Sequence, residues 1–155
     1  MSPDYPTRRL GQPYLAAAVA CLALAATFGV LSAIPHGWPS TLSPLPLQKI
    51  RPFHTTFAIA WIFLAYMGCL YHFLPEVCGR DWRFPSLARL QFWLLIAAGL
   101  VASGTYLAGR VSGREYLEFP LLTSALIGAA WIAFLVHFFA TVHQRPRPWP
   151  AYLWM

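Results

Sequence analysis

The stretch Arg51-Pro52-Phe53-His54-Thr55-Thr56 opens an apolar run that continues from Phe57 to Leu74 and closes at Pro75-Glu76. An apolar run of about twenty residues is long enough to cross the hydrocarbon core of a bilayer as a helix. His54 therefore stands at the mouth of a predicted membrane-spanning helix. A histidine at this depth can be a haem ligand, a proton-handling group or an interfacial anchor, and the rest of the chain bears on that choice.

The composition is that of a membrane protein. Of the 155 residues, 58% are apolar and only 10% are charged, whereas about a quarter of the residues are charged in soluble domains. The net charge of +6 bears on orientation in the membrane and does not indicate a nucleic-acid partner. The three cysteines, Cys21, Cys69 and Cys78, form no CxxC or CxxCH arrangement, which argues against attached c-type haem, a zinc site or a disulfide framework.

Four apolar stretches predict an all-α membrane protein with one domain of four transmembrane helices in an up-down bundle. The predicted spans are residues 13–34, 53–74, 90–109 and 120–142. Residues 1–12 are expected to form a cytoplasmic tail, and residues 143–155 a second, proline-rich cytoplasmic tail. We expect a multi-pass membrane protein.

The basic residues predict the orientation of the four spans. The two tails and the second loop carry seven: Arg8, Arg9, Arg80, Arg83, Arg89, Arg145 and Arg147. The first and third loops carry four: Lys49, Arg51, Arg110 and Arg114. Because basic residues are enriched on the cytoplasmic side, both termini are expected in the cytoplasm.

The histidines leave several interpretations open. His54 is either an axial haem ligand or an interfacial histidine bonded to a carbonyl, and Lys49 and Arg51 either bind the haem propionates or anchor the helix at the interface. His36 is a weaker candidate for a second ligand of the same haem. His72 and His137 could hold a second haem or simply form hydrogen bonds inside the bundle. Because His72 lies eighteen positions after His54, or roughly 27 Å along a helix, these two cannot serve one iron.

A pair of acidic residues and a stripe of small residues are further candidates for function or packing. Glu115 and Glu118 form an ion-pair cluster with neighbouring arginines, bind a cation or feed protons toward a buried cofactor, and spacing alone does not separate these possibilities. Gly99 and Ser103 belong to a stripe of small residues suited to close helix contact.

Several sequence motifs, taken together with the spacing between them, resemble those of one family. They are Arg51-Pro52-Phe53-His54-Thr55-Thr56, Met67-Gly68, Tyr71-His72-Phe73-Leu74-Pro75-Glu76, Leu90-Gln91-Phe92-Trp93 and Gly113-Arg114-Glu115-Tyr116-Leu117-Glu118-Phe119-Pro120. With them, the chain from about residue 45 to residue 143 resembles the N-terminal helices of nitric oxide reductase large subunits and of the catalytic subunits of C-type haem–copper oxidases.

The resemblance implies roles for individual residues. The histidine that matches His54 is an axial ligand of the low-spin haem b in that family, and the acids that match Glu115 and Glu118 lie near the active-site haems, where one is tied to metal or proton handling. His72 departs from the family, which usually has an aromatic residue there. Family members continue through further helices that carry the other haem ligands and the histidines of the second metal. This chain alone is therefore not expected to hold a binuclear centre.

Three hypotheses follow. In the first, the protein is a haem-b electron-transfer subunit of a larger respiratory complex. His54 would be a ligand, Arg51 and Lys49 would bind the propionates, and the apolar wall would consist of Phe53, Phe57 and Trp61. The opposite ligand would come from another membrane subunit or from a second copy of the chain, and a periplasmic electron carrier is a further candidate partner. In the second, the protein is a cofactor-free structural or assembly subunit. In the third, it is a self-contained di-haem cytochrome b that pairs His36 with His54 and His72 with His137.

Overall fold

The chain folds into four long α-helices. The computed structural model describes residues 5–37, 47–113 and 118–144, and within them a short 3₁₀ helix precedes the four α-helices. The elements are η1 (Pro6–Leu10), α1 (Gly11–Gly37), α2 (Leu47–Cys78), α3 (Pro85–Leu107) and α4 (Leu121–Val142). All four α-helices are long and apolar enough to cross a membrane. The predicted all-α fold with four spans is confirmed, while the cytoplasmic location of the termini stays a prediction.

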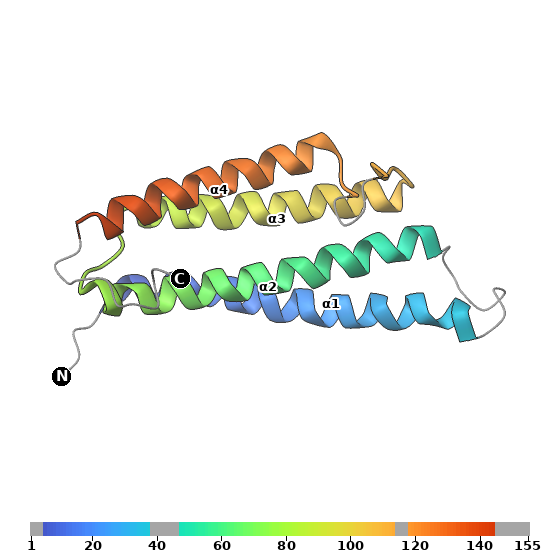
Figure 1. Ribbon diagram of the computed structural model, residues 1–155, viewed down its shortest axis with the longest axis horizontal. Helices are drawn as coiled ribbons and strands as arrows, with labels where there is room; N and C mark the ends of the chain where they lie inside the picture. The colour runs from blue at the N-terminus through green and yellow to red at the C-terminus, as the bar shows by residue number, and fades with distance from the viewer. Residues whose placement is uncertain (1–4, 38–46, 114–117, 145–155) are drawn as a thin grey trace.

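The helices form two antiparallel pairs that lie side by side (Figure 1). One pair is α1 with α2 and the other is α3 with α4, and the start of α1 lies at the same end of the molecule as the end of α4. We call this end, which holds the turn between α2 and α3, the Trp82 end. The opposite end, where α2 and α4 begin, is called the His54 end.

Helix α2 extends beyond the predicted span on both sides and contains Pro52 and Pro75. Because Pro75 has no N–H, it cannot bond to the carbonyl of Tyr71 four residues earlier. The indole Nε1–H of Trp82 donates to that carbonyl instead, at 3.0 Å. Gly79, whose φ of 69° is readily adopted by glycine, follows the last helical residue. The proline is therefore accommodated, and the helix continues past the breaker that was expected to end it.

The described part of residues 1–12 is structured, although the sequence predicted a tail. The guanidinium of Arg8 donates to the Glu76 carboxylate at 2.7 Å and to the His72 carbonyl at 3.1 Å. The Thr7 hydroxyl bonds to the Asp81 carboxylate and accepts the backbone N–H of Trp82. Helix η1 is therefore tied to the end of α2 and to the turn that follows it.

Glycine permits the close approach of α1 to α2. A Cβ atom on Gly11 would overlap the carbonyl oxygen of Gly68, so no side chain fits at this position. By contrast, a Cβ on Gly99 or on Gly104 meets no atom within 4 Å in the described part of the chain. Within the described part of the chain, Gly99 therefore makes no close helix contact, because it lines a space between the two helix pairs, and a contact of this stripe with a partner helix stays a prediction.

Candidate functional site

His54 lies in the third turn of α2 and packs against α1. Its ring Nδ1 is 2.8 Å from the carbonyl oxygen of Ala25. Gly29, one turn further along α1, makes room for the ring, because a Cβ at this position would lie 3.0 Å from both Cε1 and Nδ1 of His54. The side chain is only half-buried, so α1 fixes the imidazole on one side.

The Ala25 contact determines which ring nitrogen carries the proton. A carbonyl oxygen can only accept a hydrogen bond, so Nδ1 of His54 must be the donor. In the neutral ring, Nε2 then keeps its lone pair. Histidines that bind metals usually donate their other ring N–H in this way, which fixes the tautomer and the ring orientation.

A stack of aromatic rings lies beside the histidine on α1 and α2. The rings of Phe28 and Phe53 are stacked with centroids 4.7 Å apart, and Phe57 lies 6.1 Å from both of them. Phe57 also lines the space between the helix pairs. Trp61, seven residues after His54 and hence close to the same face of α2, is half-buried.

The two predicted propionate-binding residues point in different directions. Lys49 Nζ lies 3.4 Å from the carbonyl oxygen of Leu107, at the end of α3. Five residues separate Lys49 from His54, or roughly 140° around a helix, so Lys49 lies on a different face. Arg51 is exposed and lies only roughly 60° from His54 around α2, which leaves it on the same side as the histidine.

The predicted acids are only partly described. Glu115 lies outside the described residues, and so does the side chain of His36. Glu118 begins the last described stretch, and its backbone carbonyl accepts the N–H of Ser112 at 2.9 Å. Its Oε2 atom is buried, and no hydrogen-bond partner for it occurs among the described residues.

His137 lies far from His54, at the Trp82 end. It is completely buried and stacks on the Trp82 indole, with centroids 4.4 Å apart. Tyr71 covers it from α2, with centroids 5.8 Å apart. Neither ring nitrogen has a hydrogen-bond partner in the part of the chain that the structure describes. With Trp82 on one ring face, His137 has no open side for a porphyrin, and His72 contacts Phe73 and offers its backbone carbonyl to Arg8.

A buried hydrogen-bond cluster joins the two helix pairs beside His137. The Tyr14 hydroxyl lies 2.6 Å from the Ala88 carbonyl and 3.1 Å from Gln91 Oε1. The Tyr71 hydroxyl donates to the same Gln91 oxygen. Tyr14, Tyr71 and Gln91 are each at most 1% exposed. This cluster has satisfied hydrogen bonds and no open coordination position, which suits a structural junction.

The structure does not gather a multidentate metal site in its described part. Among those residues, no group of three or more His, Cys, Asp or Glu side chains could hold a metal ion. His54 remains as a single imidazole with a fixed tautomer, and Ala25 and Gly29, which fix it, were not found from the sequence. Their contribution is a backbone carbonyl and an absent side chain, and neither leaves a motif.

Comparison with known proteins identifies the family. A family model described as cytochrome c and quinol oxidase polypeptide I matches residues 9–155. The chain belongs to this family. The resemblance to nitric oxide reductases and C-type oxidases noted from the sequence is thereby confirmed.

The matches to individual relatives cover only part of each relative's length. A nitric oxide reductase chain of Stutzerimonas stutzeri is 27% identical over 146 residues, which cover 84% of this chain and 31% of the relative. The Cbb3-type cytochrome c oxidase subunit CcoN1 of the same organism is 30% identical over 125 residues, or 76% of this chain and 26% of the relative. Ubiquinol oxidase subunit 1 of Acetobacter aceti is 31% identical over 89 residues, or 56% of this chain and 13% of the relative. The chain spans about a third or less of these family members, whose names describe subunits of oxidases and reductases.

Proposed function

We propose that the protein is a haem-b-binding membrane subunit of a haem–copper oxidase or nitric oxide reductase type complex, and that His54 is an axial ligand of its low-spin haem. The observation that carries this proposal is the 2.8 Å contact between His54 Nδ1 and the Ala25 carbonyl. It leaves the Nε2 lone pair of a half-buried imidazole available, which is the arrangement that an axial ligand needs.

The surroundings of His54 fit a porphyrin better than those of His137 or His72. His137 is completely buried under Trp82, and His72 lies beside η1, whereas His54 is covered by a neighbouring helix on one side only. Arg51 lies on the His54 side of α2 and is our candidate for a propionate partner. Lys49 lies against α3 and is a weaker candidate for that role.

The chain's own residues would hold, orient and shield the group. The Ala25 carbonyl orients the imidazole and increases the electron density on Nε2, Gly29 permits close packing of the ring, and Trp61 supplies apolar surface. A bound low-spin haem would supply one-electron transfer. The opposite ligand would come from another membrane subunit or from a second copy of the chain, and the reaction of the whole complex would take place on that larger assembly.

The first experiment is a pyridine haemochrome assay with reduced-minus-oxidised spectra on the purified protein, together with the variants His54→Ala and His137→Ala. We expect a b-type α band in the wild type and in His137→Ala, and no such band in His54→Ala. A haem-to-chain ratio of one half would indicate a haem shared in a homodimer. A band that survives in His54→Ala would overturn the assignment.

Absence of haem from the wild type, purified with its partner subunits, would contradict the haem proposal as a whole. It would support the hypothesis of a cofactor-free structural subunit. Two haems per chain in the wild type, with one of them lost in His54→Ala and one lost in His137→Ala, would instead favour the di-haem hypothesis. Each outcome therefore separates one of the three hypotheses from the others.

We further infer that both termini face the cytoplasm, that the protein resides in the bacterial inner membrane, and that a periplasmic carrier could deliver electrons. The support is the distribution of basic residues, seven on the side of the termini and four on the opposite side. Reporter fusions at the C-terminus and in the loop between α3 and α4 test the orientation. Activity of a periplasm-specific reporter at the C-terminus would contradict it.

A further inference from the structure

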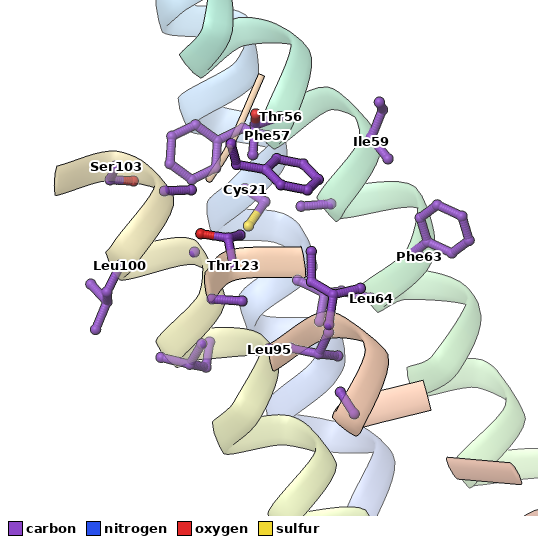
Figure 2. Close-up of a pocket in the computed structure, with 18 of the residues that line it drawn as sticks. Cys21, Thr56, Phe57, Ile59, Phe63, Leu64, Leu95, Leu100, Ser103 and Thr123 are labelled. Atoms are coloured by element: carbon purple, nitrogen blue, oxygen red, sulfur yellow. The ribbon is translucent and has the colours of Figure 1, made fainter. Parts of the chain in front are cut away.

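A cavity of about 420 Å³ lies between the two helix pairs. Figure 2 shows side chains of all four helices gathered around this space, with Ser103 and Leu100 on the α3 side, and with Ile59 and Phe63 on the α2 side. The walls are almost entirely apolar. Labelled side chains that line the cavity include Cys21, Phe57, Leu64, Leu95, Ser103 and Thr123.

The cavity exists because the helix pairs meet at both ends and stand apart between them. At the Trp82 end, Tyr14 and Tyr71 share the amide of Gln91. At the His54 end, the hydroxyl groups of Thr56 and Tyr106 are 2.8 Å apart. Between these contacts, α3 presents small side chains and Gly99, where a Cβ would meet no described atom within 4 Å. The lining of α3 runs from Gln91 to Ser103, a length of roughly 18 Å along the helix axis.

The rims of the cavity are formed by exposed apolar side chains. Leu24 and Leu100 are 41% and 69% exposed, and Ile59 and Phe63 are 37% and 49% exposed. All four residues line the cavity and lie in candidate membrane spans. An apolar molecule could therefore enter sideways from the bilayer without passing through water.

One polar group in the cavity is buried without a described partner. Thr123, the third residue of α4, lines the cavity, and its side chain is 1% exposed. No hydrogen-bond partner for it occurs among the described residues. A buried hydroxyl without a partner is costly, and the apolar walls disfavour a filling of water. An elongated apolar ligand would fill the apolar space, and one hydrogen-bond acceptor on it near the His54 end would give the hydroxyl a partner.

We propose that the cavity binds one acyl chain of a membrane phospholipid, with the Thr123 hydroxyl donating to the ester carbonyl. Because Thr123 lies in the first turn of α4, it is close to the depth at which a spanning helix leaves the hydrocarbon core. The ester carbonyl of a phospholipid lies at that boundary, and the chain extends from it toward the membrane centre, along α3 toward Gln91. The cavity volume is within the range of ligand pockets.

Photocrosslinking tests the proposal directly. The full chain is reconstituted in nanodiscs of phosphatidylcholine that carries a diazirine in the middle of one acyl chain, irradiated, and mapped by peptide mass spectrometry. We expect adducts on cavity-lining residues such as Leu95 and Ile127, in addition to those on outward-facing residues such as Trp93. Adducts confined to outward-facing residues would overturn the proposal, and this measurement on the wild type does not depend on the folding of any variant.

A matched pair of variants gives the second test. Gly99→Leu fills the cavity, whereas Gly104→Leu adds the same side chain to the same helix at an exposed position that does not line it. We expect the yield of cavity adducts to fall roughly tenfold in Gly99→Leu, because the new side chain displaces methylene groups from the apolar wall. Gly104→Leu should keep the wild-type yield, and equal yields in the two variants would contradict the proposal.

The role of the hydroxyl is tested with Thr123→Val, which keeps the shape of the side chain. We expect the cavity adducts to fall between about twofold and tenfold, the range for loss of one hydrogen bond. Circular dichroism and gel filtration should match the wild type. An unchanged yield in Thr123→Val would overturn the assignment of Thr123 as the ester donor.

Discussion

The two ends of the molecule treat a histidine in opposite ways. At the Trp82 end, His137 is completely enclosed by aromatic rings, and neither of its nitrogens has a partner among the described residues. At the His54 end, His54 is half-buried, and one of its nitrogens is bonded to a backbone carbonyl of α1. Burial alone would rank His137 as the more unusual residue. Ligation requires an oriented ring whose second nitrogen keeps its lone pair, and the bond of Nδ1 to Ala25 leaves Nε2 of a neutral His54 in that state.

The same contrast extends to the surroundings of the two residues. The Trp82 end joins all four helices through the hydrogen bonds of Tyr14, Tyr71 and Gln91 and the stacking of Trp82 on His137. The His54 ring packs against Ala25 and Gly29 of α1, while Phe53 and Thr56 of α2 reach Tyr106 on α3. The Trp82 end therefore supplies the larger set of buried contacts between the helix pairs, and under our proposal the face bearing His54 binds the further group.

The largest expected effect tests the functional side of this contrast. Replacing His54 with alanine should lower the haem content by more than about tenfold, because the iron loses its axial ligand on this chain. His137→Ala should leave the haem content unchanged but reduce the free energy of unfolding by about 2–4 kcal/mol, since it opens a hole beside Trp82. Haem content and denaturant titration in detergent measure the two quantities, and a reversed pattern would refute the contrast.

The glycine under the His54 ring gives the next largest effect. Gly29→Ala places a methyl group 3.0 Å from the imidazole, so the ring must shift by a few tenths of an ångström. We expect a change in the reduction potential of the bound haem and weaker haem retention, because the bond to Ala25 that orients the ring is disturbed. Spectroelectrochemistry measures the potential, and Gly128→Ala, whose Cβ meets no described atom within 4 Å, should behave as the wild type.

A third prediction concerns the junction at the Trp82 end. Gln91→Leu removes the acceptor that Tyr14 and Tyr71 share. Tyr14 keeps its bond to the Ala88 carbonyl, so mainly the Tyr71 hydroxyl is left without a partner. The free energy of unfolding should fall by about 1–3 kcal/mol, with no change in the haem spectrum. A spectral change in this variant would show that the two ends are coupled.

The smallest effect is expected where the Trp82 end meets solvent. The ion pair between Arg8 and Glu76 is partly exposed, and such pairs contribute about 0–1 kcal/mol. Glu76→Gln should therefore lower the free energy of unfolding by less than about 1 kcal/mol, and the loss should shrink further in high salt. Thermal unfolding at two salt concentrations checks this, and a larger loss would assign η1 a greater part in the junction.

The sequence was sufficient for the fold, and it singled out His54 as a candidate ligand, which stays a prediction. Four apolar runs predicted the four spans, and the motif that opens the second run indicated the histidine. The partners of that histidine could not be predicted, because Ala25 and Gly29 lie far away in the chain and act through a carbonyl and an absent side chain. The spacing from His54 already placed Lys49 and Arg51 on different faces of α2, whereas the contact of Lys49 with the Leu107 carbonyl on α3 could not be predicted.

The small-residue stripe on α3 shows a different limit. Small residues such as Gly99 permit close helix contact but do not enforce it. The separation of the helix pairs is set elsewhere, by the large side chains of Tyr14, Tyr71 and Tyr106 at the two ends of the cavity. Local spacing in the sequence carries no information on which of these groups determines the distance.

The hydrogen bond from Trp82 to the carbonyl freed by Pro75 bears on the order in which the protein is assembled. It links residues only 11 positions apart, and the contacts of η1 with Glu76 and Asp81 also lie within the first 82 residues. All of these groups leave the ribosome before α3 and α4. The contacts of η1, α2 and Trp82 can therefore form during synthesis, before α4 has been made. His137 would then pack against a Trp82 ring that is already in place.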